Sequence, residues 1–557
     1  MSLSSTRLGL ALGLVLSVSA ATTAAAEAHT LLHNARIHTL DADGRVVEAM
    51  AWDAQGRLLE LGDSAALVER HAGAARIDAG GSTVVPGLID AHGHLINLGH
   101  ALLRANLVGA SSKQEVIQRL QAHVRDLPEG EWLLGRGWDQ TRWPGGEFPT
   151  AADLDAHFPD RPVWLERIDG HAAWGNSAAL AFASQPLEGD WQPEGGRILR
   201  DPEGRPTGVF IDTAEDLVNA AIPRPSAEVE ALALQKAVQE AVRFGLTGVH
   251  DAGVSLRQLA LYRRFADEGR LPLRVYAMAN GDAEALDALC AMGHYRHPGG
   301  RLQMRAVKLY IDGALGSRGA ALIEDYSDEP GNRGLLLAEP SAFEKTLAKA
   351  RDCGVQVAAH AIGDRGNRVV LDGFERVLGE SASADHRWRI EHAQVVSLDD
   401  IPRFPRLGVI ASMQPTHATS DMRWAQDRLG PARLAGAYAW RRMVEAGALL
   451  ALGSDFPVEE VDPVLGLHAA ATRQDARGWP EGGWLASQLL SLDEALRGFT
   501  LQAAYSGFAE AEVGSLEPGK RADFVFLSRA LEGLDPADIL DLRVESTWVD
   551  GRRVHPR

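Results

Sequence analysis

Five short apolar runs in this chain each end on a side chain that binds metal ions in other proteins. Each run has the length and composition of a buried β-strand. The carboxyl ends of parallel strands in a barrel converge on one site, so side chains in these positions would meet. The runs end on His92 and His94, on Lys308, on His360, on His392 and on Asp455. The pattern predicts a metal centre at the mouth of a barrel.

The histidines differ in how strongly they indicate a ligand. His92 and His94 are two residues apart, so on a strand both side chains would point to the same face, an arrangement that suits Zn²⁺ or a similar divalent ion. His360 and His392 each close an apolar run. A single strand-end histidine is more often structural, but two in this order support a ligand role. His417 and His468 are taken as ordinary isolated histidines.

Asp455 lies in the run Gly-Ser-Asp-Phe-Pro at residues 453–457. An aspartate before proline is often a turn or cap residue. The functional interpretation is a metal-bound carboxylate that also accepts a proton from the attacking water, because hydrolysis at a metal site needs such a group within reach of that water.

Lys308 would be a costly buried cation at the end of a barrel strand. Burial lowers the pKa of an ammonium group, and a neutral amine can add carbon dioxide to become a carbamate, an anionic ligand able to bridge two metals. The alternatives are an ion pair with a carboxylate such as Asp312 and direct binding of substrate.

Composition bounds the class of protein and its partners. The chain has 557 residues, 45% hydrophobic and 24% charged, which fits a barrel plus a second domain. The net charge of -19 and the lack of a basic stripe argue against nucleic acid as a partner. A small-molecule substrate is expected, and barrels of this size often form homo-oligomers.

Residues 1–26 read as a secretory signal peptide. Arg7 precedes an apolar run over residues 8–18, and Ala24, Ala25 and Ala26 form a small-residue cleavage site. The run is short for a membrane span, so no stable membrane insertion is expected after cleavage. The mature protein would be periplasmic or secreted. An uncleaved leader that holds an interaction protein at the membrane is the alternative.

The rest of the chain predicts an α/β fold in two parts. Residues 27–85 and 511–557 are β-rich and turn-rich, which indicates one small composite β-sandwich built from both chain ends. Residues 86–510 alternate helix and strand patterns, as in a (β/α)8 TIM-like barrel. Strands at 162–167, 246–251 and 409–414 bring the five runs to eight. A helix is expected at 232–244.

Two further features of the barrel region carry expectations. Residues 100–160 are a long insertion after the first strand, which we expect to add helices and cover the site. Cys290 and Cys353 could pair in an exported protein, but the preferred interpretation is that both are buried small hydrophobic residues beside helices.

Longer motifs around these residues resemble the amidohydrolase superfamily. The similarity covers essentially everything after the signal peptide, and more narrowly the chain is similar to amidohydrolase family 3, the branch that includes N-substituted formamide deformylase. The motifs that carry this resemblance lie at residues 135–139, 169–180, 308–318, 413–417 and 453–457.

The resemblance implies a metal centre whose ligands can be assigned by position. His92 and His94 would hold a first divalent metal with Asp455, Lys308 would bridge, and His360 with His392 would hold a second. Members of the superfamily differ in metal count, so the resemblance leaves one or two ions open, with Zn²⁺ the favoured metal.

Other residues are candidates for contacts with the substrate. His171 is expected near the mouth, and His171, Arg318 and the second metal are candidates for stabilising the oxyanion. Arg318 could also clamp a substrate carboxylate, and Asp169 is a further candidate for contact with the substrate. Trp138 and Trp174 would wall an apolar pocket. The alternatives are a loop histidine held by Asp169 for His171, a surface ion pair for Arg318, and buried core aromatics for the two tryptophans.

The expected activity is hydrolysis of a non-peptide carbon–nitrogen bond, most simply an amide. Deamination, or hydrolysis of a cyclic amide or ester, would use the same metal site. The alternative outside the enzymes is a non-catalytic protein that binds a metal or a ligand. The complete series of metal ligands argues against it.

Overall fold

The computed structural model describes residues 29–127, 130–140, 143–167, 172–193, 196–380 and 384–556. The predicted signal peptide at residues 1–26 lies outside these ranges. Within them, no helix combines the length and the apolar character that crossing a membrane requires.

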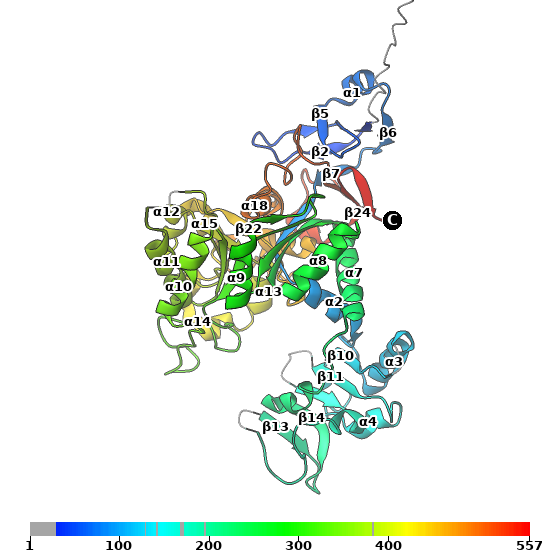
Figure 1. Ribbon diagram of the computed structural model, residues 1–557, viewed down its shortest axis with the longest axis vertical. Coiled ribbons are helices and arrows are strands. Elements are labelled where there is room, and N and C mark those ends of the chain that lie inside the picture. Colours follow the sequence, from blue (N-terminus) through cyan, green and yellow to red (C-terminus); the bar gives the residue numbers. More distant parts are fainter. Residues whose placement is uncertain are drawn as a thin grey trace, which may run out of the picture.

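Eight parallel strands form a nearly closed barrel, as Figure 1 shows in the centre of the molecule. Neighbouring strands pair in chain order from the first to the last. In that order they are β8 (Leu88–Gly93), β15 (Leu246–Val254), β16 (Arg274–Ala279), β18 (Leu302–Tyr310), β19 (Gln356–Ala361), β20 (Arg389–His392), β21 (Ile410–Met413) and β22 (Leu450–Leu452). The predicted (β/α)8 barrel is confirmed.

Helices follow every barrel strand and cover the outside of the ring. They are α2 (Leu95–Leu103) and α7 (Ala227–Arg243), α8 (Leu256–Asp267), α9 (Ala283–Met292), α10 (Pro340–Asp352), α11 (Asp364–Leu378), α12 (Arg403–Leu407), α13 (Pro415–Asp421), α14 (Ala425–Arg433), α15 (Trp440–Ala446), α16 (Pro463–Thr472), α17 (Leu492–Gly498) and α18 (Leu501–Ser506). In α7, Ser226 caps the first turn, and the buried residues Leu234, Val238 and Ala241 form one apolar stripe. This is the helix expected at 232–244.

One predicted barrel strand is wrong. Residues 162–167 form β11 (Val163–Arg167), which pairs with neighbours in a separate sheet. The second position in the barrel belongs to β15, and β16 is the strand that the sequence analysis missed. An apolar run of this length fits either sheet equally well, and β16 ends on Ala279 with no chemistry-bearing side chain to mark it.

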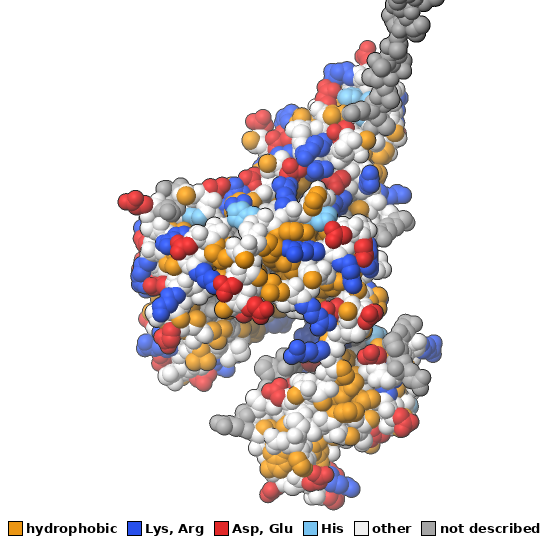
Figure 2. All heavy atoms as spheres, in the orientation of Figure 1, with side chains coloured by type: hydrophobic (Ala, Val, Ile, Leu, Met, Phe, Trp, Pro, Cys, Tyr) orange, Lys and Arg blue, Asp and Glu red, His pale blue; other side chains and the backbone are white. Residues whose placement is uncertain are grey.

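The long insertion after β8 is a lobe with a sheet of its own, seen below the barrel in Figure 1. Its strands, in sheet order, are β13 (Gly196–Arg200), β14 (Pro206–Asp212), β12 (Ala172–Gly175), β11, β10 (Leu133–Trp138) and β9 (Ala105–Asn106). Its helices are α3 (Lys113–His123), α4 (Ala151–Asp155), α5 (Ser177–Leu180) and α6 (Asp216–Asn219). The space-filling view shows a hollow between this lobe and the barrel body (Figure 2).

Helices α2 and α7 connect the lobe to the barrel and pack closely against each other. The closest approach is at Gly99, where a Cβ atom would lie 2.1 Å from the carbonyl oxygen of Ala233. Only glycine allows the two helices to come this near.

The two chain ends share one small β domain, as predicted. A six-stranded sheet has the order β25 (Arg552–His555), β24 (Val544–Val549), β23 (Phe524–Leu527), β7 (Thr83–Pro86), β2 (Arg36–His38) and β3 (Val46–Val47). A four-stranded sheet has the order β5 (Leu58–Gly62), β4 (Ala49–Trp52), β1 (Thr30–His33) and β6 (Ala75–Asp78). Met50 from one sheet and Phe524 from the other lie in one buried cluster. Strand β7 leads directly into β8, so this domain anchors the first barrel strand.

Cys290 and Cys353 form a disulfide, which corrects the interpretation of both as unpaired hydrophobic residues. Cys290 lies in α9 and Cys353 caps the end of α10, two outer helices of the barrel. The spacing of 63 residues gave no indication that the two helices are neighbours.

Candidate metal centre

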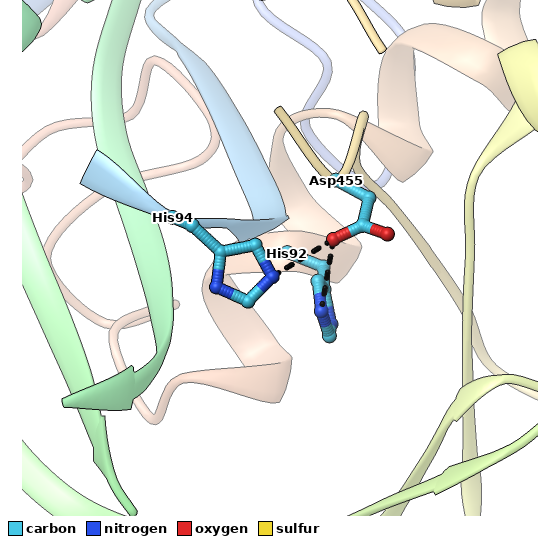
Figure 3. Close-up of side chains that lie close together, drawn as sticks. All are labelled: His92, His94 and Asp455. Atoms are coloured by element: carbon cyan, nitrogen blue, oxygen red, sulfur yellow. Dashed lines mark hydrogen bonds and ion pairs between the residues drawn. The ribbon is translucent and has the colours of Figure 1, made fainter. Parts of the chain in front are cut away.

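The mouth of the barrel brings the six predicted ligands into one cluster around Asp455. The Asp455 Oδ1 atom lies 2.9 Å from His94 Nε2 and 3.4 Å from His92 Nε2. Figure 3 shows both imidazoles turned toward this carboxylate. Lys308 Nζ lies 3.2 Å from His92 Nε2. The His392 ring is 5.0 Å from that of His92 and 4.5 Å from that of His360, measured between centroids.

The closure of the barrel positions Asp455. Strands β22 and β8 are not paired along their length, but just beyond β22 the Asp455 N–H donates to the His92 carbonyl oxygen at 2.7 Å. The preceding Ser454 donates to buried Asp90 from its hydroxyl at 2.6 Å. Asp455 adopts φ of 64°, a left-handed conformation that is unfavourable for a residue with a Cβ. Such strain is typical of residues held in place for a functional reason.

Three histidines of the cluster have their Nδ1 atoms occupied by neighbouring acceptors. His92 Nδ1 contacts the Glu391 carboxylate, His94 Nδ1 is 2.9 Å from the Ala252 carbonyl oxygen, and His392 Nδ1 is 2.9 Å from Gln414 Oε1. An acceptor at Nδ1 fixes the tautomer that carries its proton there. Each Nε2 atom is therefore left with a lone pair, which is the form that binds a metal.

A buried ion pair lies beneath His92. Arg389 and Glu391 are fully buried, and their side chains pair directly. The Arg389 guanidinium also donates to Ser412 Oγ at 2.7 Å. Although burial would raise the pKa of Glu391, the charge of Arg389 and the hydrogen bond with His92 hold it well below its usual value. Glu391 is thus an ionised acceptor for His92, a role that the sequence analysis did not assign.

Lys308 is buried and has no ion pair with Asp312. Burial lowers the pKa of the Lys308 ammonium to about 8, against the opposing charges of Glu391 and Asp455. Asp312 instead accepts hydrogen bonds from the backbone N–H groups of Ala321, Ile362 and Gly363, so it organises the backbone. The predicted alternative of a Lys308–Asp312 pair is wrong.

His360 presents a buried nitrogen that lacks a hydrogen bond. Within the described residues its Nε2 atom has no hydrogen-bond partner, and Asp312 Oδ1 lies 3.6 Å from it. Burial and the Lys308 charge lower the pKa of His360 to about 3, so the imidazole is neutral. A buried, neutral and unsatisfied nitrogen is costly unless a ligand occupies it, and a divalent cation would do so.

The ligand atoms of His92, His94 and Asp455 lie near enough together to hold one ion. Two imidazole nitrogens and a carboxylate are donors that Zn²⁺ commonly takes. Burial and the Lys308 charge lower the pKa of His92 to about 4, which leaves it neutral and ready to coordinate. The residues present therefore fit a divalent metal.

His417 is a member of the cluster that sequence reasoning missed. It lies in α13, directly after β21, with Nε2 3.3 Å from Asp455 Oδ2 and Nδ1 3.1 Å from Glu459 Oε1. A lone histidine two residues beyond a proline gave no signal by its type. The signal that could have indicated His417 was its position just past the end of a barrel strand.

The predicted substrate-binding residues are spread more widely. Trp138 and Trp174 are buried in the core of the lobe, where their indole N–H groups donate to Leu165 at 2.7 Å and Thr150 at 2.8 Å. Arg318 pairs with Asp328 at 2.9 Å and with Glu329 at 3.2 Å. Their contacts with substrate stay predictions. Asp169 and His171 lie outside the described residues.

Comparison with known proteins identifies the class to which this barrel and its His/His/Asp site belong. A solved structure, an uncharacterized metal-dependent hydrolase from Pyrococcus horikoshii, is 30% identical with a TM-score of 0.76 and covers 95% of this chain and 100% of its own. The fold and site are those of a metal-dependent hydrolase.

Residues 75–555 match the sequence model of the Amidohydrolase family, and the chain belongs to that family. Protein LONG AFTER FAR-RED 3 of Arabidopsis thaliana is 35% identical over 95% of this chain and 92% of its own length. N-substituted formamide deformylase of Arthrobacter pascens is 28% identical over 94% and 97%. The resemblance seen in the motifs is confirmed.

Proposed function

We propose that this protein hydrolyses a non-peptide carbon–nitrogen bond, an amide in the simplest case, with Zn²⁺ held at the barrel mouth. The observation that carries the proposal is the placement of Asp455 against the Nε2 atoms of His92 and His94. The relative named N-substituted formamide deformylase supports an N-substituted amide as the substrate class.

The residues of the metal centre have different roles in the proposed reaction. A divalent ion bound by His92, His94 and Asp455 would lower the pKa of a water molecule toward neutrality. Asp455 accepts the proton of the attacking water and returns it to the leaving nitrogen. Contacts with His417 and His94 outweigh the effect of burial and hold the pKa of Asp455 well below its usual value, so the carboxylate starts ionised.

Lys308 is proposed to carry a carbamate. Its amine attacks the carbon of carbon dioxide and loses a proton, which gives an anion at the end of β18. The lowered pKa of about 8 and the missing Asp312 pair support this chemistry, because a neutral amine is the nucleophile. With [13C]bicarbonate, the metal-loaded protein should give a carbamate carbon resonance that Lys308→Arg lacks. A spectrum without that resonance in the wild type would exclude the modification.

The proposed export of the mature protein rests on the N-terminal pattern at residues 1–26 and on the Cys290–Cys353 disulfide. Disulfides of this kind persist in oxidising compartments such as the periplasm. N-terminal sequencing of exported protein should find a start near residue 27. A start at Met1 would support the uncleaved alternative.

The hydrolase proposal is tested with Asp455→Asn, which keeps the size of the side chain and removes the base. We expect amide turnover to fall by at least about 100-fold while the circular dichroism spectrum is unchanged. Asp352→Asn, in an exposed position, is the matched control. A panel of N-substituted formamides, a lactone and an aminoheterocycle separates the candidate reactions. Chelator-resistant turnover, or near-normal turnover by Asp455→Asn, would overturn the mechanism.

A further inference from the structure

A small polar pocket lies beside the metal cluster and shares His94 with it. Figure 3 shows the Nε2 edge of the His94 ring turned to the Asp455 carboxylate, and the Nδ1 edge meets the Ala252 carbonyl oxygen of β15 at 2.9 Å. The pocket has a volume of about 220 Å³ and is lined by His94, by Asn97 of α2, by residues 251–254 of β15 and by Gln258 of α8. Because His94 borders both the cluster and the pocket, a substrate bound at the metal centre can reach the pocket with a short substituent.

Gln258 lines the pocket with an amide whose orientation is fixed. Its Oε1 atom accepts from the Ser255 backbone N–H at 2.9 Å and from the Ser255 hydroxyl at 3.0 Å, which closes a capping box at the start of α8. A backbone N–H can only donate, so the atom that it meets is the amide oxygen and the NH₂ group lies on the other side of the amide. Among the residues that the structure describes, none accepts a hydrogen bond from this Nε2 atom. Gln258 therefore keeps a free donor.

Asn97 contributes a second free amide. It is the third residue of α2, as Gln258 is the third residue of α8, so both amides come from the first turns of helices that border the pocket. Asn97 is exposed, and within the described part of the chain its side chain makes no hydrogen bond. The carboxylate in the pocket wall is occupied, because Asp251 accepts from the Tyr262 hydroxyl and from the Leu95 N–H at 2.9 Å. The pocket thus offers a ligand two amide N–H donors.

Tyr310 connects this pocket with the metal cluster. Its ring lies beside that of His360 with centroids 5.5 Å apart, and Lys308 Nζ is 4.9 Å from its centre. Its hydroxyl oxygen lies 3.4 Å from the position that a Cβ atom on Gly253 would take, and Gly253 is part of the pocket wall. Tyr310 is 40% exposed, so it presents an aromatic surface between the cluster and the pocket. A substituent that leads from the metal centre to the two amides would pass this surface.

We propose that the pocket binds the substituent on the amide nitrogen of the substrate, and that Asn97 and Gln258 select substituents that carry a neutral hydrogen-bond acceptor such as a carbonyl oxygen. The inference rests on the proposed hydrolysis of an N-substituted amide and names the chemistry of the substituent. An apolar substituent of the same shape would displace water from the two donors without replacing its hydrogen bonds, so it should bind less well. If the pocket holds only solvent, polar and apolar substituents will behave alike.

The experiment compares two formamides of the same shape. N-acetonylformamide carries a ketone oxygen, and N-methallylformamide carries a methylene group in its place. We expect the metal-loaded wild type to hydrolyse the ketone with a kcat/KM about 10-fold higher, chiefly through a lower KM.

Two variants remove the donors and spare the helices. Gln258→Glu keeps the oxygen that caps α8 and replaces the NH₂ group by a second oxygen, and Asn97→Asp makes the same change in α2. Each should bring the ratio of the two kcat/KM values close to one, whereas Gln239→Glu, at an exposed position of α7, should leave it at the wild-type value. Equal kcat/KM values in wild type, or a ratio that neither pocket variant changes, would overturn the proposal.

A binding measurement separates this inference from the proposed function. Crystals of Asp455→Asn soaked with N-acetonylformamide should show the ketone oxygen within hydrogen-bond distance of the Asn97 and Gln258 amides. Equal turnover of the two formamides by wild type, with no density in the pocket, would reject the pocket and retain the hydrolase. Density in the pocket without turnover of any amide by wild type would reject the hydrolase and retain the pocket as a binding site, and absence of both would reject both.

Discussion

The backbone N–H of Asp455 donates a hydrogen bond to the carbonyl oxygen of His92 at 2.7 Å. Two residues with side chains in the metal cluster are therefore also joined through their main chains, across the seam where the last barrel strand meets the first. Phe456 extends the seam, because its carbonyl oxygen accepts from the His94 N–H at 2.9 Å. The spacing of the ligands thus depends on the closure of the barrel.

Gly453→Ala should disturb this seam. A Cβ at position 453 would lie 2.5 Å from Asp90 Oδ1 and 2.6 Å from the His92 nitrogen, and neither can move without breaking the closure. We expect a loss of about 1–3 kcal/mol in unfolding free energy together with weaker cation binding. Urea denaturation and Co²⁺ titration measure the two effects. Gly73→Ala, where a Cβ meets no atom within 4 Å, is the control, and equal behaviour of both variants would contradict this account.

Glu391→Gln should affect both stability and metal binding. The substitution leaves the fully buried Arg389 without its counter-charge, which costs about 3–5 kcal/mol. It also replaces the ionised acceptor of His92, so cation affinity should fall by about 10- to 100-fold.

The double variant Arg389→Met/Glu391→Gln separates these two effects, because it removes the unpaired charge as well. Chemical denaturation should show recovered stability while dialysis shows that affinity stays low. If affinity returned together with stability, His92 would not depend on the charge of Glu391.

The ligand order was readable from the sequence because each ligand closes an apolar strand. His92, Lys308, His360 and His392 carry that signal in their own neighbourhood, and the structure brings them together at the strand ends. β11 carried the same apolar signal in a different sheet, and β16 ended on Ala279 without a functional side chain. Pattern identifies a strand, whereas the sheet it joins depends on contacts between distant residues.

Glu391 and His417 were missed for a related reason. The partner of Glu391, His92, and the partners of His417, Asp455 and Glu459, come from other barrel strands or their connections, so local spacing does not reveal these pairs. The Cys290–Cys353 disulfide joins neighbouring outer helices in the same way. Such contacts become visible only when the barrel is assembled.

Removing the disulfide should lower stability and leave the site intact. The bond closes a loop between residues 63 positions apart, and constraint of the unfolded chain on this scale is worth about 2–4 kcal/mol. Cys290→Ser/Cys353→Ser should lose that amount in urea denaturation and keep its cation stoichiometry, because α9 and α10 lie outside the ring. Reduction of the disulfide in the wild-type protein should cause the same loss of unfolding free energy. An unchanged unfolding free energy would mean that the bond adds no stability.

Acid should weaken the contact between α15 and α17 through Glu494. Arg441 binds both carboxylate oxygens of Glu494, at 2.8 and 2.6 Å, and the Ser491 N–H donates to it at 2.7 Å. The Arg441 hydrogen bond is the main cause that lowers the pKa of Glu494 from 4.5 to about 2. The folded state therefore binds the proton less readily than the unfolded state, so this stabilisation is present above pH 4.5 and is lost as the pH falls toward about 2.

Glu494→Gln removes this pH-dependent contribution. The full difference in pKa corresponds to about 3 kcal/mol, and because the side chain is 31% exposed, solvent screening reduces it to about 1–2 kcal/mol. Urea denaturation should show the variant less stable than wild type by that amount at pH 7, with the difference shrinking as the pH falls from 4.5 toward 2. The control Asp493→Asn changes an exposed neighbouring residue. Its unfolding free energy should stay within about 0.5 kcal/mol of wild type at both ends of this pH range. A Glu494→Gln difference that is constant with pH would show that the Arg441 contact acts through packing rather than charge.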